Sequence, residues 1–307
     1  MSKARSRQCP LAATTSVTTF PPPIRQTRRS AMLMLRNIAL ACTFTMIPLG
    51  NALAQTTAPQ TSSPTYTPDV GQHGKDVIWV PTPQALVDRM LEMAGITEND
   101  YVIDLGSGDG RTVVSVAKLG ARAHGIEYNP DMVALSRRNA QEAGVADRAT
   151  FAEEDIFQSD FSDASVITLF LLPELNVRLR PTLLDMKPGT RVVSNSFNMG
   201  DWQPDDRVEA GEKCENYCRA FKWVVPAKVA GDWRHGEGKL SLTQNYQMLS
   251  GTLTNNGTAH AISEAKIDGT RISFTAGGMR YTGSVSGESM TVGTQGGVNW
   301  TATRSQD

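Results

Sequence analysis

The sequence predicts an α/β fold, in which a Rossmann-like open sheet is followed by a small all-β meander or barrel-like domain. An apolar stretch runs into a glycine-rich turn at residues 101–111, and the next two apolar stretches each lead into acidic residues. From residue 226 onward, short alternating stretches are separated by Asn-Gly and Asp-Gly turns instead. The first pattern is typical of strands alternating with helices, and the second of all-β domains.

The glycine-rich turn reads Asp-Leu-Gly-Ser-Gly-Asp-Gly-Arg over residues 104–111, and a helix is predicted from about 111 to 119. A turn of this kind lets backbone N–H groups approach a nucleotide-like ligand. It departs from the dinucleotide fingerprint G-x-G-x-x-G, because the third glycine comes one residue early. A carboxylate at the strand tip suits a ligand with an ammonium group and would repel a pyrophosphate. The predicted ligand-binding residues of this turn are Asp104, Gly106, Ser107, Gly108 and Gly110.

Two further strand ends carry acidic side chains. Glu127 ends the apolar stretch 123–127, about twenty residues after the turn, where a Rossmann-like fold places a carboxylate on ribose hydroxyls. After a helix predicted at 131–143, a third strand at 149–152 leads to Asp155 and Ile156. Acids on solvated loops are the alternative. Three acids at successive strand ends, however, converge on the ligand crevice of an open α/β sheet.

These motifs resemble those of class I S-adenosylmethionine (SAM)-dependent methyltransferases, whose motif I has the form D-x-G-x-G-x-G. The resemblance implies that SAM is the cofactor and that Glu127 binds its ribose. It also implies that Asp155 lies near the adenine amine, with Ile156 as apolar cover for the ring. The expected architecture is a seven-stranded methyltransferase sheet over residues 75–225, followed by a β-domain at 226–307.

The segment before the first strand is predicted to be an extended lead-in over residues 77–83. Thr82 is the predicted N-cap of the following helix and Pro83 its first residue, and apolar residues follow at helical spacing. A capped turn at this place also offers backbone N–H groups to the methionine carboxylate of SAM, which makes Thr82 a candidate cofactor residue. Simple initiation of the helix is the alternative.

An apolar fourth strand is predicted at residues 164–170, and it opens into Leu171, Leu172, Pro173 and Glu174. Many amino-methylating members of the class hold an Asn/Asp-Pro-Pro-aromatic turn here, so its absence argues against methylation of nucleic-acid bases and glutamine. Glu174, with Pro173, is the predicted catalytic element, because a carboxylate would hold a lysine ammonium or assist the loss of its proton. The alternative is a favourable charge in the first turn of a helix at 174–186.

A fifth strand at 191–197 and a reversed hairpin at 206–211 and 217–225 complete the predicted sheet. The β-domain contains no recognisable catalytic constellation, and either substrate recruitment or packing on the first domain would explain it. Its strands are predicted at 231–233, 239–254, 261–268, 271–275, 279–285, 289–293 and 298–303.

Residues 1–54 do not resemble part of a fold. Basic residues, a short apolar run at 38–49 and an A-x-A-like site indicate a secretory signal peptide that is cleaved near Ala54, and hence an exported or periplasmic protein. An uncleaved membrane anchor over residues 38–50 is the alternative. Residues 55–74 read as a Thr/Ser/Pro/Gln-rich linker.

Cleavage at that site would change both the charge and the cysteine content. Seven of the 30 basic residues and none of the 31 acidic residues lie in 1–54, so the remaining chain has a net charge of −8. A net negative charge of this size argues against binding to nucleic acid, whose phosphates attract basic surfaces. Its remaining cysteines, Cys214 and Cys218, would form a local disulfide in an oxidising compartment or stay free. No second pair or histidine cluster supports a zinc site.

Four runs within residues 75–225 together resemble one family: V-P-T-P at 80–83, D-L-G-S-G-D-G-R at 104–111, G-I-E at 125–127 and L-L-P-E-L at 171–175. They are similar to bacterial relatives of the mitochondrial lysine methyltransferases that modify the ATP synthase c-subunit and the adenine nucleotide translocase. The resemblance implies methyl transfer to an amine, most directly a protein lysine, and a membrane-proximal substrate is compatible with it. A small-molecule acceptor, or an exported SAM-binding protein without catalysis, is the alternative.

Overall fold

The computed structural model describes residues 66–211, 214–294, 297 and 299–305, which belong to one compact unit. The predicted signal peptide, the alternative membrane anchor and most of the linker lie outside the described residues. Within the described ranges, none of the helices has the length and apolar character needed to cross a membrane.

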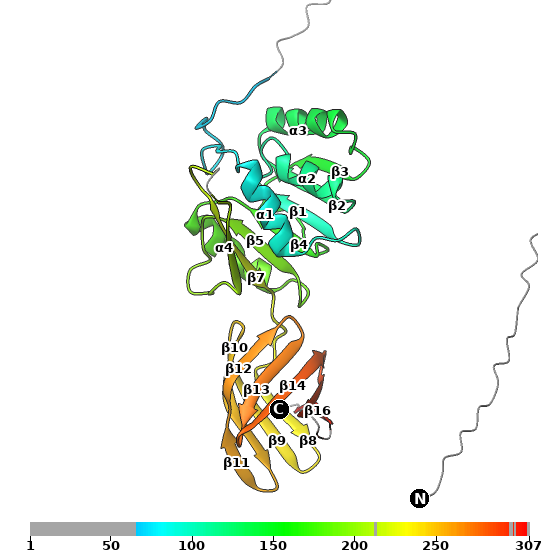
Figure 1. Ribbon diagram of the computed structural model, residues 1–307, viewed down its shortest axis with the longest axis vertical. Helices are drawn as coiled ribbons and strands as arrows, with labels where there is room; N and C mark the ends of the chain where they lie inside the picture. The colour runs from blue at the N-terminus through cyan, green and yellow to red at the C-terminus, as the bar shows by residue number, and fades with distance from the viewer. Residues whose placement is uncertain (1–65, 212–213, 295–296, 298, 306–307) are drawn as a thin grey trace, which may run out of the picture. The chain divides into compact units, whose positions relative to one another are not determined.

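The first half of the described chain builds a seven-stranded mixed sheet (Figure 1). Its spatial order is β3-β2-β1-β4-β5-β7-β6; β1 to β5 pair in parallel, and β7 pairs antiparallel with both β5 and β6. The predicted sheet, with five parallel strands and a reversed hairpin, is thereby confirmed. The strands are β1 (Tyr101–Leu105), β2 (Arg122–Glu127), β3 (Ala149–Glu153), β4 (Val166–Leu169), β5 (Arg191–Asn195), β6 (Asp206–Glu209) and β7 (Arg219–Val224).

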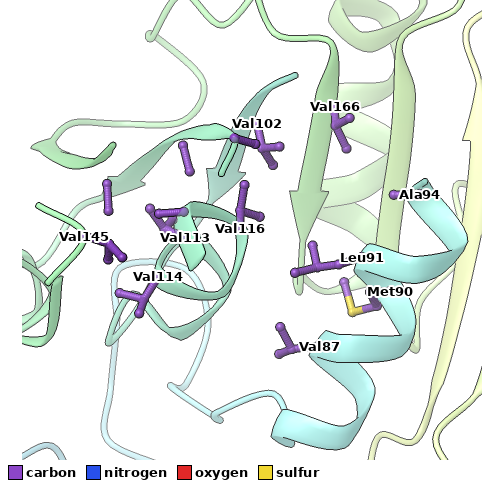
Figure 2. Close-up of a cluster of buried hydrophobic side chains, with 14 of the residues drawn as sticks. Val87, Met90, Leu91, Ala94, Val102, Val113, Val114, Val116, Val145 and Val166 are labelled. Atoms are coloured by element: carbon purple, nitrogen blue, oxygen red, sulfur yellow. The ribbon is translucent and has the colours of Figure 1, made fainter. Parts of the chain in front are cut away.

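Four helices cover this sheet: α1 (Gln84–Ala94), α2 (Arg111–Lys118), α3 (Pro130–Glu142) and α4 (Pro173–Leu184). Successive strand residues point to opposite faces, so Val102 packs with α1, α2 and α3 in one buried cluster, whereas Ile103 packs with α4 in another. Figure 2 shows the first cluster, in which Val87 and Leu91 lie along α1 and Val113 and Val116 along α2. Apolar cores on both faces explain why the central strands are nearly continuous in apolar residues.

The start of α1 differs from the prediction. The helix begins at Gln84, Pro83 is its N-cap residue, and no side chain caps it. The Thr82 hydroxyl instead accepts a hydrogen bond from Asn195 Nδ2 at 3.1 Å, which ties the lead-in to the end of β5. The Thr82 hydroxyl therefore makes a tertiary hydrogen bond and does not cap the helix as the local sequence predicts.

The second half of the chain forms an antiparallel barrel, which confirms the predicted small all-β domain (Figure 1). Eight of its strands close into a ring because β9 pairs with β10, and β11 adds to the edge of β10. Buried Trp233 and Phe274 belong to its apolar core. The strands are β8 (Gly231–His235), β9 (Gly238–Asn245), β10 (Met248–Asn255), β11 (Thr258–Ala261), β12 (Ser263–Asp268), β13 (Arg271–Ala276), β14 (Met279–Ser286), β15 (Ser289–Thr294) and β16 (Trp300–Arg304).

The prediction of a single strand over residues 239–254 is wrong. These residues form a hairpin of β9 and β10 that turns at Tyr246 and Gln247. Tyr246 has a φ of 54°, in the left-handed region, which its residue type does not signal. The turn packs on the first half of the chain: the Tyr246 ring stacks on buried Trp202 with centroids 6.0 Å apart, and Gln247 Nε2 donates to the Gln203 carbonyl at 2.7 Å. Side-chain packing therefore fixes a turn that no glycine marks.

Candidate functional site

A cavity lies where the carboxyl ends of the parallel strands meet, next to the point at which the strand order reverses between β1 and β4. Open α/β sheets bind ligands at this place. The cavity is also lined by the N-terminal segment that precedes α1. Of the predicted site residues, those in the lining are Thr82, Asp104, Gly106, Ser107, Gly108, Glu127, Asp155 and Ile156, whereas Gly110, Pro173 and Glu174 are outside it.

The glycine-rich turn is shaped by contacts that exclude side chains. A Cβ on Gly108 would lie 2.6 Å from Trp79 Nε1, and one on Gly110 would lie 2.8 Å from both the Phe151 ring and Ser136 Cβ. Both glycines also have positive φ, 55° and 79°, which L side chains rarely adopt. The Ser136 hydroxyl donates to the Gly108 carbonyl at 2.8 Å. Gly110 thus acts by close packing of the loop and not by lining the cavity.

Glu127 ends β2 with its carboxylate held by backbone amides. Oε2 accepts from the Gly108 N–H at 2.9 Å, and Oε1 accepts from the Asn129 N–H at 3.0 Å. A carboxylate has about four acceptor positions, so each oxygen retains capacity for another donor. This arrangement suits a pair of neighbouring hydroxyl groups.

Asp104 is the buried carboxyl of the cavity, with 7% of its surface exposed. Thr168 Oγ1 donates to its Oδ1 at 2.6 Å. Desolvation by burial raises the pKa of Asp104 to about 7, although the hydrogen bond from Thr168 acts in the opposite direction. A cationic group beside it would favour the carboxylate and lower this pKa.

Asp155 is held by side chains and backbone around it. Its Oδ2 accepts from Lys75 Nζ at 2.7 Å, and its Oδ1 accepts from the Phe157 N–H at 3.0 Å. The hydrogen bond from Lys75 is the main cause that lowers the pKa of Asp155. Ile156 lines the cavity, whereas the Phe157 ring lies outside the lining, 3.6 Å from the Arg178 guanidinium.

Ser107 lines the cavity, but its side chain packs toward β2. A Cβ on Gly125 would lie 2.5 Å from Ser107 Oγ. The hydroxyl is buried and has no hydrogen-bond partner among the described residues. Its contact with the neighbouring strand makes Ser107 a packing residue of the turn as well as part of the cavity wall.

Residues 72 and 74–76, which precede the predicted lead-in and also line the cavity, are the part of the site that sequence reasoning missed. Residues 71–79 fold back on themselves, since the Gly71 N–H donates to the Trp79 carbonyl and the Trp79 N–H to the Gln72 carbonyl, both at 2.8 Å. Arg111 Nη1 donates to the Thr82 carbonyl at 2.9 Å and so connects this segment to the glycine-rich turn. The signal available in the sequence was Trp79, a large aromatic residue that comes shortly after the polar linker.

The opposite end of the cavity is apolar. Beyond β4 and β5 its lining consists of leucine and aromatic side chains, with no charged group in this part of the described lining: Leu169, Phe170, Leu171, Leu172, Leu175, Phe197 and Tyr217. Asp104, Glu127 and Asp155 all lie on the side of β1, β2 and β3. The cavity therefore has a polar half and an apolar half.

Glu174 is exposed in the first turn of α4, and neither it nor Pro173 lines the cavity. A carboxylate at this position favours the helix through its dipole. The geometry therefore supports the alternative for Glu174, a charge at a helix N-terminus, and gives the predicted catalytic role no contact with the cavity.

Comparison with known proteins identifies the family of this chain. Residues 104–206 match the model of the ANTKMT methyltransferase domain. A protein-lysine N-methyltransferase of Saccharolobus islandicus is 41% identical over 140 residues, which cover 44% of this chain and 87% of that protein. The chain belongs to the ANTKMT methyltransferase family. Members of this family are SAM-dependent methyltransferases, and SAM is the cofactor of this enzyme.

Other relatives of this ANTKMT-family enzyme are matched over shorter shares. The mouse lysine N-methyltransferase of the ATP synthase c-subunit is 34% identical over 134 residues, which cover 43% of this chain and 54% of that protein. An RNA methyltransferase from Salinibacter ruber, crystallised in complex with S-adenosyl-L-homocysteine, is 47% identical; the match covers 49% of this chain and 96% of that chain, with a TM-score of 0.46. The chain thus spans about half the length of the mouse relative.

The residues of the polar half fit SAM by their chemistry. Glu127 offers acceptors for the two ribose hydroxyls, and the buried carboxyl of Asp104 suits the ammonium group of the methionine part. Ile156 provides apolar surface beside the end of β3, where an adenine ring would lie. The contact of Asp155 with the adenine amine stays a prediction, because its carboxylate is bonded to Lys75.

Proposed function

We propose that this ANTKMT-family enzyme transfers the methyl group of SAM to the side-chain nitrogen of a lysine in a protein substrate. The observation that carries the proposal is the apolar half of the cavity, which adjoins the cofactor residues. The lysine methyltransferase activities of the archaeal and mouse relatives support the same acceptor.

The strand order supports the apolar half as the place of the acceptor. Glu127 ends β2 and Ile156 follows β3, both on one side of β1, and Asp104 lies on β1 itself. With the adenosine and methionine parts on these residues, the space beyond β4 and β5 is left for the methyl acceptor. This space is lined by Phe170, Phe197 and the leucines around Leu171.

An apolar acceptor space would prepare an amine for the reaction. A lysine has a pKa near 10.4 in water, and desolvation disfavours its charged form. The leucine side chains of this space would therefore promote loss of the proton to solvent before transfer, without a carboxylate in contact with the amine. SAM, when bound, supplies an electrophilic methyl group on a sulfonium ion. Holding the neutral amine close to that group lowers the barrier chiefly through positioning.

The entrance of the cavity favours a protein acceptor over a free small molecule. Three residues that line it have large exposed fractions: 52% for Ile78, 43% for Leu172 and 42% for Tyr217. Exposed apolar surface beside a cavity gives a protein acceptor a surface to cover. A small apolar acceptor would use only the inner wall and would leave these residues in water.

The test is methyl transfer from labelled SAM by the full chain, incubated with fractionated cell extract, with Asp104→Ala as the control. We expect label on lysine residues of protein bands, identified by mass spectrometry and lost with the control. Label in the small-molecule fraction alone would replace the proposal by small-molecule methylation. Absence of label with SAM still bound would favour a binding protein without catalysis.

We also propose that the enzyme acts after export, with cleavage near Ala54. The disulfide between Cys214 and Cys218 supports this proposal, because such bonds persist in oxidising compartments. N-terminal sequencing of the protein from a periplasmic fraction is the measurement. A chain found only in the cytosol with an intact N-terminus would contradict the proposal.

A further inference from the structure

Three aromatic rings meet in the apolar half of the cavity, and they come from three neighbouring strand ends. Phe170 follows β4, Phe197 follows β5, and Tyr217 precedes β7. The ring centroids of Phe170 and Tyr217 are 5.1 Å apart in an edge arrangement, those of Phe170 and Phe197 are 6.1 Å apart, and those of Phe197 and Tyr217 are 6.3 Å apart. We call these three side chains the aromatic trio.

Tyr217 differs from the other two in how its backbone is held. Its φ is 55°, a conformation rarely adopted by a bulky residue. It lies inside the loop closed by the Cys214–Cys218 disulfide, whose Cα atoms are 5.6 Å apart. The Ala210 N–H donates to the Cys218 carbonyl at 2.8 Å and so continues the pairing of β6 and β7 up to the bridge. Strained backbone that the surroundings enforce is concentrated at functional sites.

Tyr217 is partly open to solvent. Its exposed fraction is 42%, although its ring contacts two other rings and lines the cavity. A tyrosine that served only to fill a core would be buried. An aromatic face at a cavity entrance is available to a ligand.

We propose that Tyr217 determines specificity for the acceptor lysine, and that the Cys214–Cys218 disulfide is the element that positions it. This inference rests on the proposed function and names the residues that recognise the acceptor. The alkyl part of the lysine packs against the aromatic trio, and its nitrogen is directed toward the methyl donor.

The movement of positive charge during methyl transfer explains why aromatic faces suit the acceptor side of the cavity. The nitrogen lone pair forms the new N–C bond, the C–S bond breaks with its electron pair going to sulfur, and the positive charge moves from sulfur to nitrogen. Aromatic faces attract cations, and methyl-lysine is recognised by such rings in other proteins. The aromatic trio therefore stabilises the charge as it develops on the acceptor and binds the methylated product.

The experiment uses the full chain with S-adenosylhomocysteine bound. The probe is a capped peptide with one Nε-trimethyllysine, and the reference is the same peptide with norleucine, a neutral side chain. The ratio of their dissociation constants is measured by NMR titration for the oxidised wild type, Tyr217→Ala, Tyr217→Phe and the Cys214→Ser/Cys218→Ser double variant. The double variant is also combined with Tyr217→Ala. The affinity for S-adenosylhomocysteine is measured in each case and shows whether the variant is folded.

The wild type is expected to prefer the trimethyllysine peptide by about tenfold, the size of a partly desolvated cation–π contact. Tyr217→Phe keeps the preference within about threefold, since phenylalanine also attracts cations. Tyr217→Ala and the double cysteine variant lose it, and loss of the disulfide has no further effect when Tyr217 is already alanine. Affinity for S-adenosylhomocysteine stays unchanged throughout.

Absence of a preference in the wild type, or its survival in Tyr217→Ala, would overturn the role of Tyr217. Survival of the preference in the double cysteine variant would overturn the role of the disulfide. Label on protein lysines without any peptide preference would refute this inference and leave the proposed function in place. A preference that depends on Tyr217 in an enzyme that labels no protein would refute the proposed function, and with it the role of Tyr217 in acceptor specificity, and would leave Tyr217 as a binding residue for methylated lysine only.

Discussion

The two halves of the cavity are built in different ways. The polar half, formed by β1 to β3, uses carboxylates held by nearby backbone amides and hydroxyls, as in Glu127 with the Gly108 and Asn129 N–H groups. The apolar half is formed by side chains that meet from β4, β5 and β7, such as Phe170, Phe197 and Tyr217. Polar groups fix a cofactor of constant structure, whereas apolar walls and a strained loop select an acceptor.

The largest expected effect concerns the loop on which the polar half depends. Gly110→Ala introduces a Cβ 2.8 Å from Phe151 and Ser136 at a φ of 79°. We expect a loss of about 3 kcal/mol in the free energy of unfolding, from backbone strain plus overpacking. The control is Gly144→Ala, at a φ of 68° with no atom within 4 Å, for which backbone strain alone costs about 1 kcal/mol. Urea denaturation checks both values, and equal losses would show that packing at Gly110 is unimportant.

The second-largest effect is expected on SAM affinity when the Glu127 carboxylate is removed. Glu127→Ala removes the carboxylate that the polar half offers to the ribose hydroxyls. We expect SAM affinity, measured by calorimetry, to fall by about 100-fold, as for two charge-assisted hydrogen bonds. Glu153→Ala is the matched control, because Glu153 pairs in register with Glu127 but is exposed and outside the cavity lining. A loss of less than about threefold in Glu127→Ala would remove Glu127 from the cofactor site.

A third effect is a pH dependence of SAM binding. Asp104 has a pKa raised to about 7, so it is largely protonated at pH 6. A cationic ligand favours the carboxylate, and affinity should therefore fall as the pH drops below 7, by up to about tenfold per unit. Calorimetry from pH 7 to 5.5 measures this slope, and Asp104→Asn should remove it. An unchanged slope in the variant would assign the dependence to another group.

The same shift has a consequence for stability without ligand. Between about pH 4 and 7 the folded state keeps a proton on Asp104 that the unfolded chain has released. The free energy of unfolding should therefore decrease as the pH rises through this window, and it should decrease less in Asp104→Asn. Denaturation series at pH 5 and pH 7 compare the two proteins.

The smallest effect is expected at Glu174. Because this residue is exposed and outside the cavity lining, Glu174→Gln should change turnover by less than about twofold, as is usual for surface substitutions. Single-turnover methyl transfer is the measurement. A tenfold loss of turnover with unchanged SAM affinity would restore the catalytic role predicted for this carboxylate.

The polar half could be predicted from sequence because its residues are close along the chain. Asp104, Gly106 and Gly108 lie within five positions, and Glu127 is bonded to a backbone amide only 19 residues earlier. Their spacing is set by β1, the glycine-rich turn and the next strand, β2, which are consecutive in the chain apart from α2. The fold class followed from the same periodic signals.

The apolar half and the N-terminal segment could not be predicted in the same way. The contact of Lys75 with Asp155 spans 80 residues, and Tyr217 meets Phe170 across 47 positions. Such pairs depend on the order of strands in the sheet, which local patterns do not state. Thr82 was assigned to a helix cap for the same reason, since its partner Asn195 is 113 residues away.

The most direct test of the division between the two halves is Phe197→Ala, assayed in parallel for SAM binding by calorimetry and for transfer of labelled methyl groups to protein. Phe197 belongs to the acceptor wall, and its ring partners, Phe170 and Tyr217, belong to the same wall. We predict a SAM dissociation constant within about twofold of the wild type and a loss of at least about tenfold in label on protein lysine, the scale expected when an aromatic wall is removed. Equal losses of SAM binding and transfer, or unchanged transfer, would contradict the division.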